Sequence, residues 1–249
     1  MKKTHGIRLL AGAALLALGP MVSAGHAAAP AQQFRVRIEN VSTENTLRPS
    51  TGAKAPAAVA PVLYVIHTNS APLFTSGKSD RGKGLEQLAE EGNPAPLAES
   101  LRNGAGIMAA GVTDTPVGAA GPGPIGPGGT YEFSFSATPG SRLSIAMMFG
   151  QSNDLFYAPG EAGIALYDSA GKPVSGDITS QIILWDAGTE VNEEPGAGPN
   201  QAPRQPAPNT GPRENGVVRP IAQVNDGFKY PGVSEVIRVT INPMQQLAR

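Results

Sequence analysis

Two carboxylates follow the apolar run in the segment "QIILWDAGTE", residues 181–190. The run ends at the chain's only tryptophan, Trp185, and Asp186, Gly188 and Glu190 follow it. Gly188 can adopt the positive φ that lets the chain turn, so that Asp186 and Glu190 approach each other. Carboxylates that lie close together repel, and they need a cation, a shared proton or separate hydrogen bonds. The spacing therefore predicts either a cation site or a hydrogen-bonded turn.

A third carboxylate, Asp154, follows another apolar run, residues 142–149, in a loop rich in turn-forming residues. If both runs are strands that end at the same edge of a sandwich, Asp154, Asp186 and Glu190 converge. Calcium binds about six to eight oxygen atoms, and loops between strands supply such ligands. We therefore predict a Ca²⁺ site formed by these three residues. Because the spacing differs from the dense acidic pattern of an EF-hand loop, the alternative is that Asp186 forms an Asx turn and Glu190 faces water.

The counts of cysteine and histidine exclude several kinds of site. The chain has no cysteine, and two of its three histidines, His5 and His26, lie in the N-terminal leader described below. A zinc site with thiolate or several imidazole ligands is therefore excluded. Any nucleophile-histidine mechanism would have to use His67, and no GxSxG motif accompanies it. We expect a structural role for His67 and a protein that is not an enzyme.

The N-terminal segment has the pattern of a signal peptide over residues 1–29. A basic start precedes the apolar stretch "LLAGAALLALGPMV", and small residues before Ala27 and Ala29 suit cleavage. The alternative is an N-terminal membrane anchor. We expect an exported bacterial protein, periplasmic or secreted, whose remaining chain carries 16 Lys and Arg against 20 Asp and Glu, a net charge of −4. This charge argues against nucleic acid and against electrostatic binding to anionic lipid.

Seven short runs have the character of strands. Three alternate apolar and polar residues, which predicts a sheet with one solvated face: 34–42, 131–137 and 235–242. Four are apolar almost throughout, which suits strands covered on both faces: 61–68, 142–149, 163–168 and 181–185. These runs predict an all-β protein, an antiparallel β-sandwich, as one domain over residues 30–249.

Helices and long loops interrupt this pattern. The segment "GKGLEQLAEEGNPAPLAESLRNG" predicts two short helices within about residues 82–103, with Gly92 ending the first and Pro94 and Pro96 opening the second. Proline and glycine are concentrated in residues 115–130 and 192–216, which predicts loops because proline lacks a backbone donor and glycine costs entropy. We expect the second loop to be mobile.

Several segments together resemble the spondin N-terminal domain family, which also occurs alone in exported bacterial proteins. In chain order they are "GLEQLAEEGNPAPLAESL", "FGQSNDLF", "ILWDAGTE", "ENGVVRPI" and "SEVIRVTI", so the resemblance covers about residues 32–243. It implies a sandwich similar to those of calcium-dependent phospholipid-binding modules, with calcium bound by acidic loop residues. The matching positions are Asp154, Asp186 and Glu190. Glu190 departs from the family, which typically has aspartate there, and the missing cysteines remove the disulfides of the animal domains.

Three functions follow from these observations. The favoured one is a monomeric, non-enzymatic calcium-binding module for adhesion or recognition in the cell envelope or outside the cell, with an unidentified protein or glycan partner. A carboxylate-based or metal-assisted hydrolase acting on glycans is the second. A calcium-dependent membrane-surface binder is the third, which the negative charge disfavours.

Overall fold

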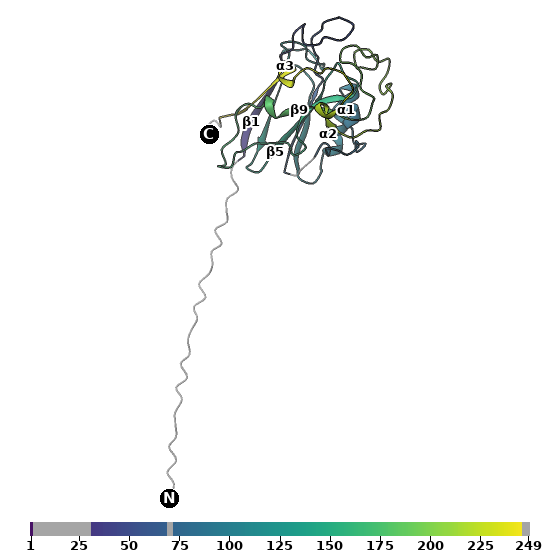
Figure 1. The fold of residues 1–249 in the computed structure, drawn as a ribbon. Helices are drawn as coiled ribbons and strands as arrows, with labels where there is room; N and C mark the ends of the chain where they lie inside the picture. The colour runs from purple at the N-terminus through teal and green to yellow at the C-terminus, as the bar shows by residue number, and fades with distance from the viewer. Residues whose placement is uncertain (2–30, 69–71, 246–249) are drawn as a thin grey trace.

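The computed structural model describes residue 1, residues 31–68 and residues 72–245, in which two antiparallel sheets pack face to face (Figure 1). The predicted signal peptide, residues 1–29, lies outside the described residues apart from Met1. Within the part of the chain that is described, every helix is too short or too polar to cross a membrane.

The first sheet has one solvated face. Its strands lie in the order β4 (Thr130–Ala137), β1 (Gln32–Asn40), β11 (Ile237–Pro243) and β8 (Gly176–Asp177). In β1, Phe34, Val36 and Ile38 are fully buried, and the intervening arginines are exposed. The alternation in the sequence therefore becomes an apolar inner face and a charged outer face, as predicted.

The second sheet forms the middle layer. Six strands follow one another in the order β10 (Arg219–Pro220), β9 (Ile182–Asp186), β6 (Leu155–Pro159), β5 (Arg142–Met148), β2 (Val62–His67) and β3 (Ile107–Thr113), and β7 (Ile164–Ala165) also pairs with β5. Helices α1 (Leu85–Glu91) and α2 (Ala95–Leu101) cover its outer face (Figure 1).

The helices explain why the strands of this sheet are apolar on both faces. In β6, Leu155 and Tyr157 belong to the core between the sheets, whereas Phe156 and Ala158 belong to a second apolar cluster that includes Leu88 of α1. Successive side chains of a strand point to opposite faces, so a strand between two apolar layers needs no polar positions. The predicted β-sandwich with two short helices is confirmed.

Some elements differ from the prediction. Strand β6 begins directly after Asp154, where the turn-forming residues predicted a loop, and β3 was not predicted. The start of the predicted strand 235–242 forms a short helix, α3 (Val233–Val236). Two single 3₁₀ turns, η1 (Thr179–Gln181) and η2 (Ile221–Gln223), complete the elements. Strand β6 has only five residues and follows a turn, so periodicity gives it little signal.

The segment 192–216 forms no helix or strand, but its two ends are paired. Val191 N donates to Pro212 O at 2.8 Å, Glu214 N to Thr189 O at 3.0 Å and Gly216 N to Gly188 O at 2.7 Å. We call residues 188–191 with 212–216 the stem, and residues 192–211 between them the excursion. The loop prediction agrees with this structure, and the mobility of the loop stays a prediction.

Candidate metal centre

The neighbouring ends of β6 and β9 bring two acidic residues together. Strands β6 and β9 run antiparallel with Leu155 opposite Asp186, so Asp154 lies beside the end of β9. On the other side of β9, Arg219 of β10 lies opposite Asp186. The predicted convergence of Asp154 with Asp186 therefore follows from the pairing of two neighbouring strands.

Asp154 is fully buried and only partly satisfied. Its Oδ2 atom accepts hydrogen bonds from the backbone N atoms of Thr189 at 3.0 Å and Glu190 at 3.1 Å. Its Oδ1 atom has no hydrogen-bond partner among the residues described. A buried oxygen without a partner costs free energy, so Oδ1 is available for a ligand.

Asp186 is also fully buried, and it forms the turn that the sequence offered as the alternative. Its Oδ1 atom accepts from Gly188 N at 2.7 Å, and its Oδ2 atom lies 3.1 Å from Arg219 Nε. Gly188 has a φ of 68°, and a Cβ atom there would lie 2.6 Å from Val217 N, so the turn requires glycine. The Asx turn and a cation site are compatible, because a carboxylate has more than one lone pair per oxygen.

Glu214 is the third carboxylate of the group, and sequence reasoning missed it. Asp154, Asp186 and Glu214 each offer a carboxylate oxygen within 4.8 Å of the other two. Glu214 Oε1 contacts Arg219 Nη2, while Glu214 Oε2 is buried and has no hydrogen-bond partner in the described structure. The stem places it there, since Glu214 N bonds Thr189 O directly beside the "WDAGTE" turn.

The carboxylate of Glu190 is not part of this group. Its Oε1 atom accepts from Gly211 N at 2.8 Å, whereas its backbone N bonds Asp154. The structure therefore assembles Asp154 and Asp186 as predicted, but with Glu214 in the position that the prediction gave to Glu190. Asn192 lies beside them, since its Nδ2 is 3.4 Å from Asp186 Oδ2 and its buried Oδ1 has no partner in the described chain.

The electrostatics of the group favour a cation. Burial raises the pKa of Asp154 well above its usual range, and the charge of Asp186 adds to this effect. Burial also raises the pKa of Glu214, followed by the charge of Asp186, while Arg219 opposes the shift. One guanidinium faces three carboxylates, so a divalent ion would neutralise the remaining charge. The unpartnered oxygens of Asp154, Glu214 and Asn192 are hard ligands, so the residues could hold a metal ion that prefers oxygen.

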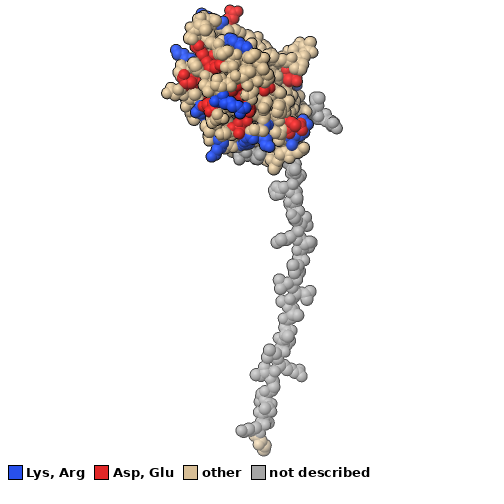
Figure 2. All heavy atoms as spheres, turned by 90° about the vertical axis from the view of Figure 1, so that its right-hand side faces the viewer, with Lys and Arg blue, Asp and Glu red and all other residues tan. Residues whose placement is uncertain are grey.

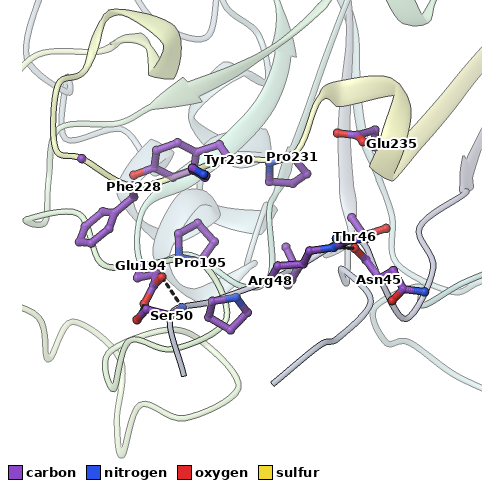
Figure 3. Close-up of a pocket in the computed structure, with 14 residues that line it drawn as sticks. Asn45, Thr46, Arg48, Ser50, Glu194, Pro195, Phe228, Tyr230, Pro231 and Glu235 are labelled. Atoms are coloured by element: carbon purple, nitrogen blue, oxygen red, sulfur yellow. Dashed lines mark hydrogen bonds between the residues drawn. The ribbon is translucent and has the colours of Figure 1, made fainter. Parts of the chain in front are cut away.

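A groove with a volume of about 520 Å³ lies elsewhere on the molecule, lined by residues that include Glu194 and Tyr230 (Figure 3). Tyr230 lines the groove and its hydroxyl donates to Asp226 Oδ2. Burial and then the neighbouring Asp226, Asp186 and Asp154 raise the pKa of Tyr230, so the groove lies within electrostatic reach of the carboxylate group. The lining residues come from three segments: 45–50, 194–195 and 227–231, with Glu235.

His67 is buried at the end of β2, and its Nε2 atom lies 2.9 Å from the Ser144 hydroxyl oxygen. This contact agrees with the structural role expected for it. A scan against protein-family models finds no match to the chain, and a search of curated proteins finds no match either. The resemblance to the spondin N-terminal domain family therefore stays a prediction that rests on the motifs quoted above.

Proposed function

We propose that this protein is an exported, non-enzymatic module that binds calcium through Asp154, Asp186 and Glu214. The observation that carries the proposal is a group of three carboxylates, two buried and one half-buried, in which Asp154 and Glu214 each keep a buried oxygen without a hydrogen-bond partner in the described chain. A buried carboxylate that lacks a compensating positive charge destabilises the folded state strongly. Binding a cation at these oxygens would remove that cost.

The type of ligand atom indicates which metal ion the site would bind. The candidate ligands are carboxylates and the amide oxygen of Asn192, which suit calcium better than zinc or copper. Calcium also tolerates irregular geometry, whereas magnesium demands a near-octahedral shell. In this role the ion is structural, because it joins the ends of β6 and β9 to the stem.

The groove supports a role in recognition. Phe228 is 37% exposed there, and Arg48 and Lys229 line the groove without an ion pair in the described part of the chain. Glu194, by contrast, accepts hydrogen bonds from the backbone N and the hydroxyl of Ser50 (Figure 3). A partly exposed aromatic ring and two cations that form no ion pair in the described chain suit an acidic partner, such as an acidic segment of a protein or glycan.

The two alternative functions have less support. A glycosidase needs two carboxylates that reach the sugar, at about 5–5.5 Å or 6.5–9.5 Å from each other, whereas Asp154 and Asp186 are fully buried. Membrane-surface binding calls for a basic or apolar face. Figure 2 shows acidic and basic side chains interspersed on the face it displays.

The experiment compares thermal unfolding of the purified protein in calcium and in chelator, with the Asp154→Asn, Asp186→Asn double variant alongside. At calcium 100 times above the dissociation constant, binding stabilises a protein by about 2.7 kcal/mol, or roughly 5–10 °C in Tm for a chain of this size. We expect the double variant to lose the part of this shift that the Asp154, Asp186 and Glu214 group contributes, so that its shift is smaller than that of the wild type. Equal shifts in both proteins would exclude the site.

A further inference from the structure

A second pair of buried carboxylates lies between α1 and the stem. Glu90, in the last turn of α1, and Glu190, in the stem, are each 1% exposed. Both oxygens of Glu90 and the Oε2 atom of Glu190 lack a hydrogen-bond partner among the described residues. Only Glu190 Oε1 is satisfied, by Gly211 N. Three of the four carboxylate oxygens are therefore buried and lack a partner within hydrogen-bond geometry, although the Thr189 and Asn153 side chains lie near enough to lower the pKa values of Glu90 and Glu190.

The surroundings of the pair are acidic. Burial raises the pKa of Glu90 to about 7, the Thr189 side chain partly offsets this, and the charges of Glu190, Glu86 and Glu91 add to it. Burial also raises the pKa of Glu190, with Gly211 N and Asn153 opposing and Glu193 and Glu86 adding to the shift. Neither carboxylate forms a salt bridge in the described structure. A buried pair of this kind needs a cation or a shared proton.

Side chains of the excursion surround the same end of α1. Gln205 Nε2 lies 3.3 Å from the backbone oxygen of Glu90, and Asn209 Nδ2 lies 3.0 Å from Glu86 Oε1. Both side chains also carry an amide oxygen, a ligand type that calcium accepts. Two segments distant in sequence, residues 86–90 and 205–211, are thus in contact beside Glu90 and Glu190, since Gly211 N also bonds Glu190 Oε1.

We propose that Glu90 and Glu190 form a second calcium site, which fastens α1 to the stem. Glu190 then serves both centres in different ways, because its backbone N bonds Asp154 while its carboxylate faces the second ion. The ion supplies the positive charge that this pair lacks. The inference goes beyond the proposed function, since it assigns a second ion and ligands outside the Asp154, Asp186 and Glu214 group.

The test counts calcium ions per chain by equilibrium dialysis against about 5 mM ⁴⁵Ca²⁺ near pH 7.5. We expect two ions in the wild type, one in Glu90→Gln, one in Asp154→Asn and none in the double variant. Glu91→Gln, on the same helix turn and less buried, is the matched control and should keep both ions. Glu90→Gln is isosteric and removes a buried charge, so its Tm in chelator should equal or exceed that of the wild type.

The outcomes separate the two sites. A single wild-type ion that Glu90→Gln retains would overturn the second site and leave a shared proton as the explanation of the pair. An ion lost in Glu90→Gln but not in Asp154→Asn would support the second site and exclude the first. If Glu90→Gln fails to fold, the wild-type count decides between two ions and one.

Discussion

Acidic residues occur in two contrasting settings in this protein. On the outer face of the first sheet, Glu132 lies 3.4 Å from Arg35 and 3.9 Å from Arg37, and Glu39 lies 2.7 Å from Arg238, all partly exposed. At the ends of β6 and β9, fully buried Asp154 and Asp186 share one arginine, Arg219, with Glu214. The outer acids are exposed to water and paired with arginines, whereas the inner acids are largely shielded from water and have a single arginine between them.

This difference separates acidic residues that form surface ion pairs from acidic residues that could bind a cation. An exposed ion pair typically contributes about 0–1 kcal/mol, so the outer acids serve solubility and pairing of the strands. Buried carboxylates without enough cations destabilise the fold unless a proton or metal ion joins them. This contrast supports the proposal that the inner acids bind a cation and the outer acids do not.

The largest expected effect of the buried acids is on the pH dependence of the free energy of unfolding in metal-free buffer. The folded-state pKa values of Asp154, Glu90, Glu190 and Glu214 are raised, so the folded state binds more protons than the unfolded state. For Glu90 this window runs from 4.5 to about 7, and the free energy of unfolding falls as pH rises through it. The measurement is urea unfolding across this range.

Two comparisons control for other groups in that experiment. The free energy of unfolding of Glu90→Gln should fall less than that of the wild type as pH rises. Calcium near pH 7.5 should restore the stability of the wild type. A free energy of unfolding that rises steadily from pH 4.5 to 7, and is unchanged by Glu90→Gln, would show that Glu90 is not held in its protonated form in the folded state.

The next contrast is between Glu214 and Glu190 as ligands of the first ion. Glu214→Gln should weaken calcium binding in the Asp154 group by about tenfold, which equals about 1.4 kcal/mol. Glu190→Gln should leave this affinity within about twofold, because its carboxylate lies outside the group. The affinities are measured in a Glu90→Gln background, which lacks the proposed second site. The reverse ranking would restore Glu190 as the ligand.

The smallest effect is expected on the outer face. Glu132→Gln removes the acid between Arg35 and Arg37 but exposes nothing that water cannot solvate. We expect the free energy of unfolding to fall by less than about 1 kcal/mol, and the difference to shrink at high salt. Calcium binding should not change. A loss of several kcal/mol would show that the two settings of acidic residues do not differ as described.

The sequence predicted the parts of the fold and site that depend on local pattern. Alternation located β1 and β4, and the apolar run before Asp186 located β9, so Asp154 and Asp186 could be placed at one edge. Glu214 could not be found, because the stem pairs residues on either side of an irregular excursion and leaves no periodicity. The direction of the Glu190 side chain depends on that same pairing.

The most direct test of the calcium site is a calorimetric titration of the metal-depleted protein with calcium, in the Glu90→Gln background and with Asp186→Asn added to it. We expect saturable binding of one ion at a dissociation constant of about 0.1–1 mM, and its loss when Asp186 is replaced. No heat at millimolar calcium, together with a Tm that calcium does not change, would exclude a calcium site at these residues. In that case the "WDAGTE" segment would be a hydrogen-bonded turn whose acids are held by Arg219 and by protons.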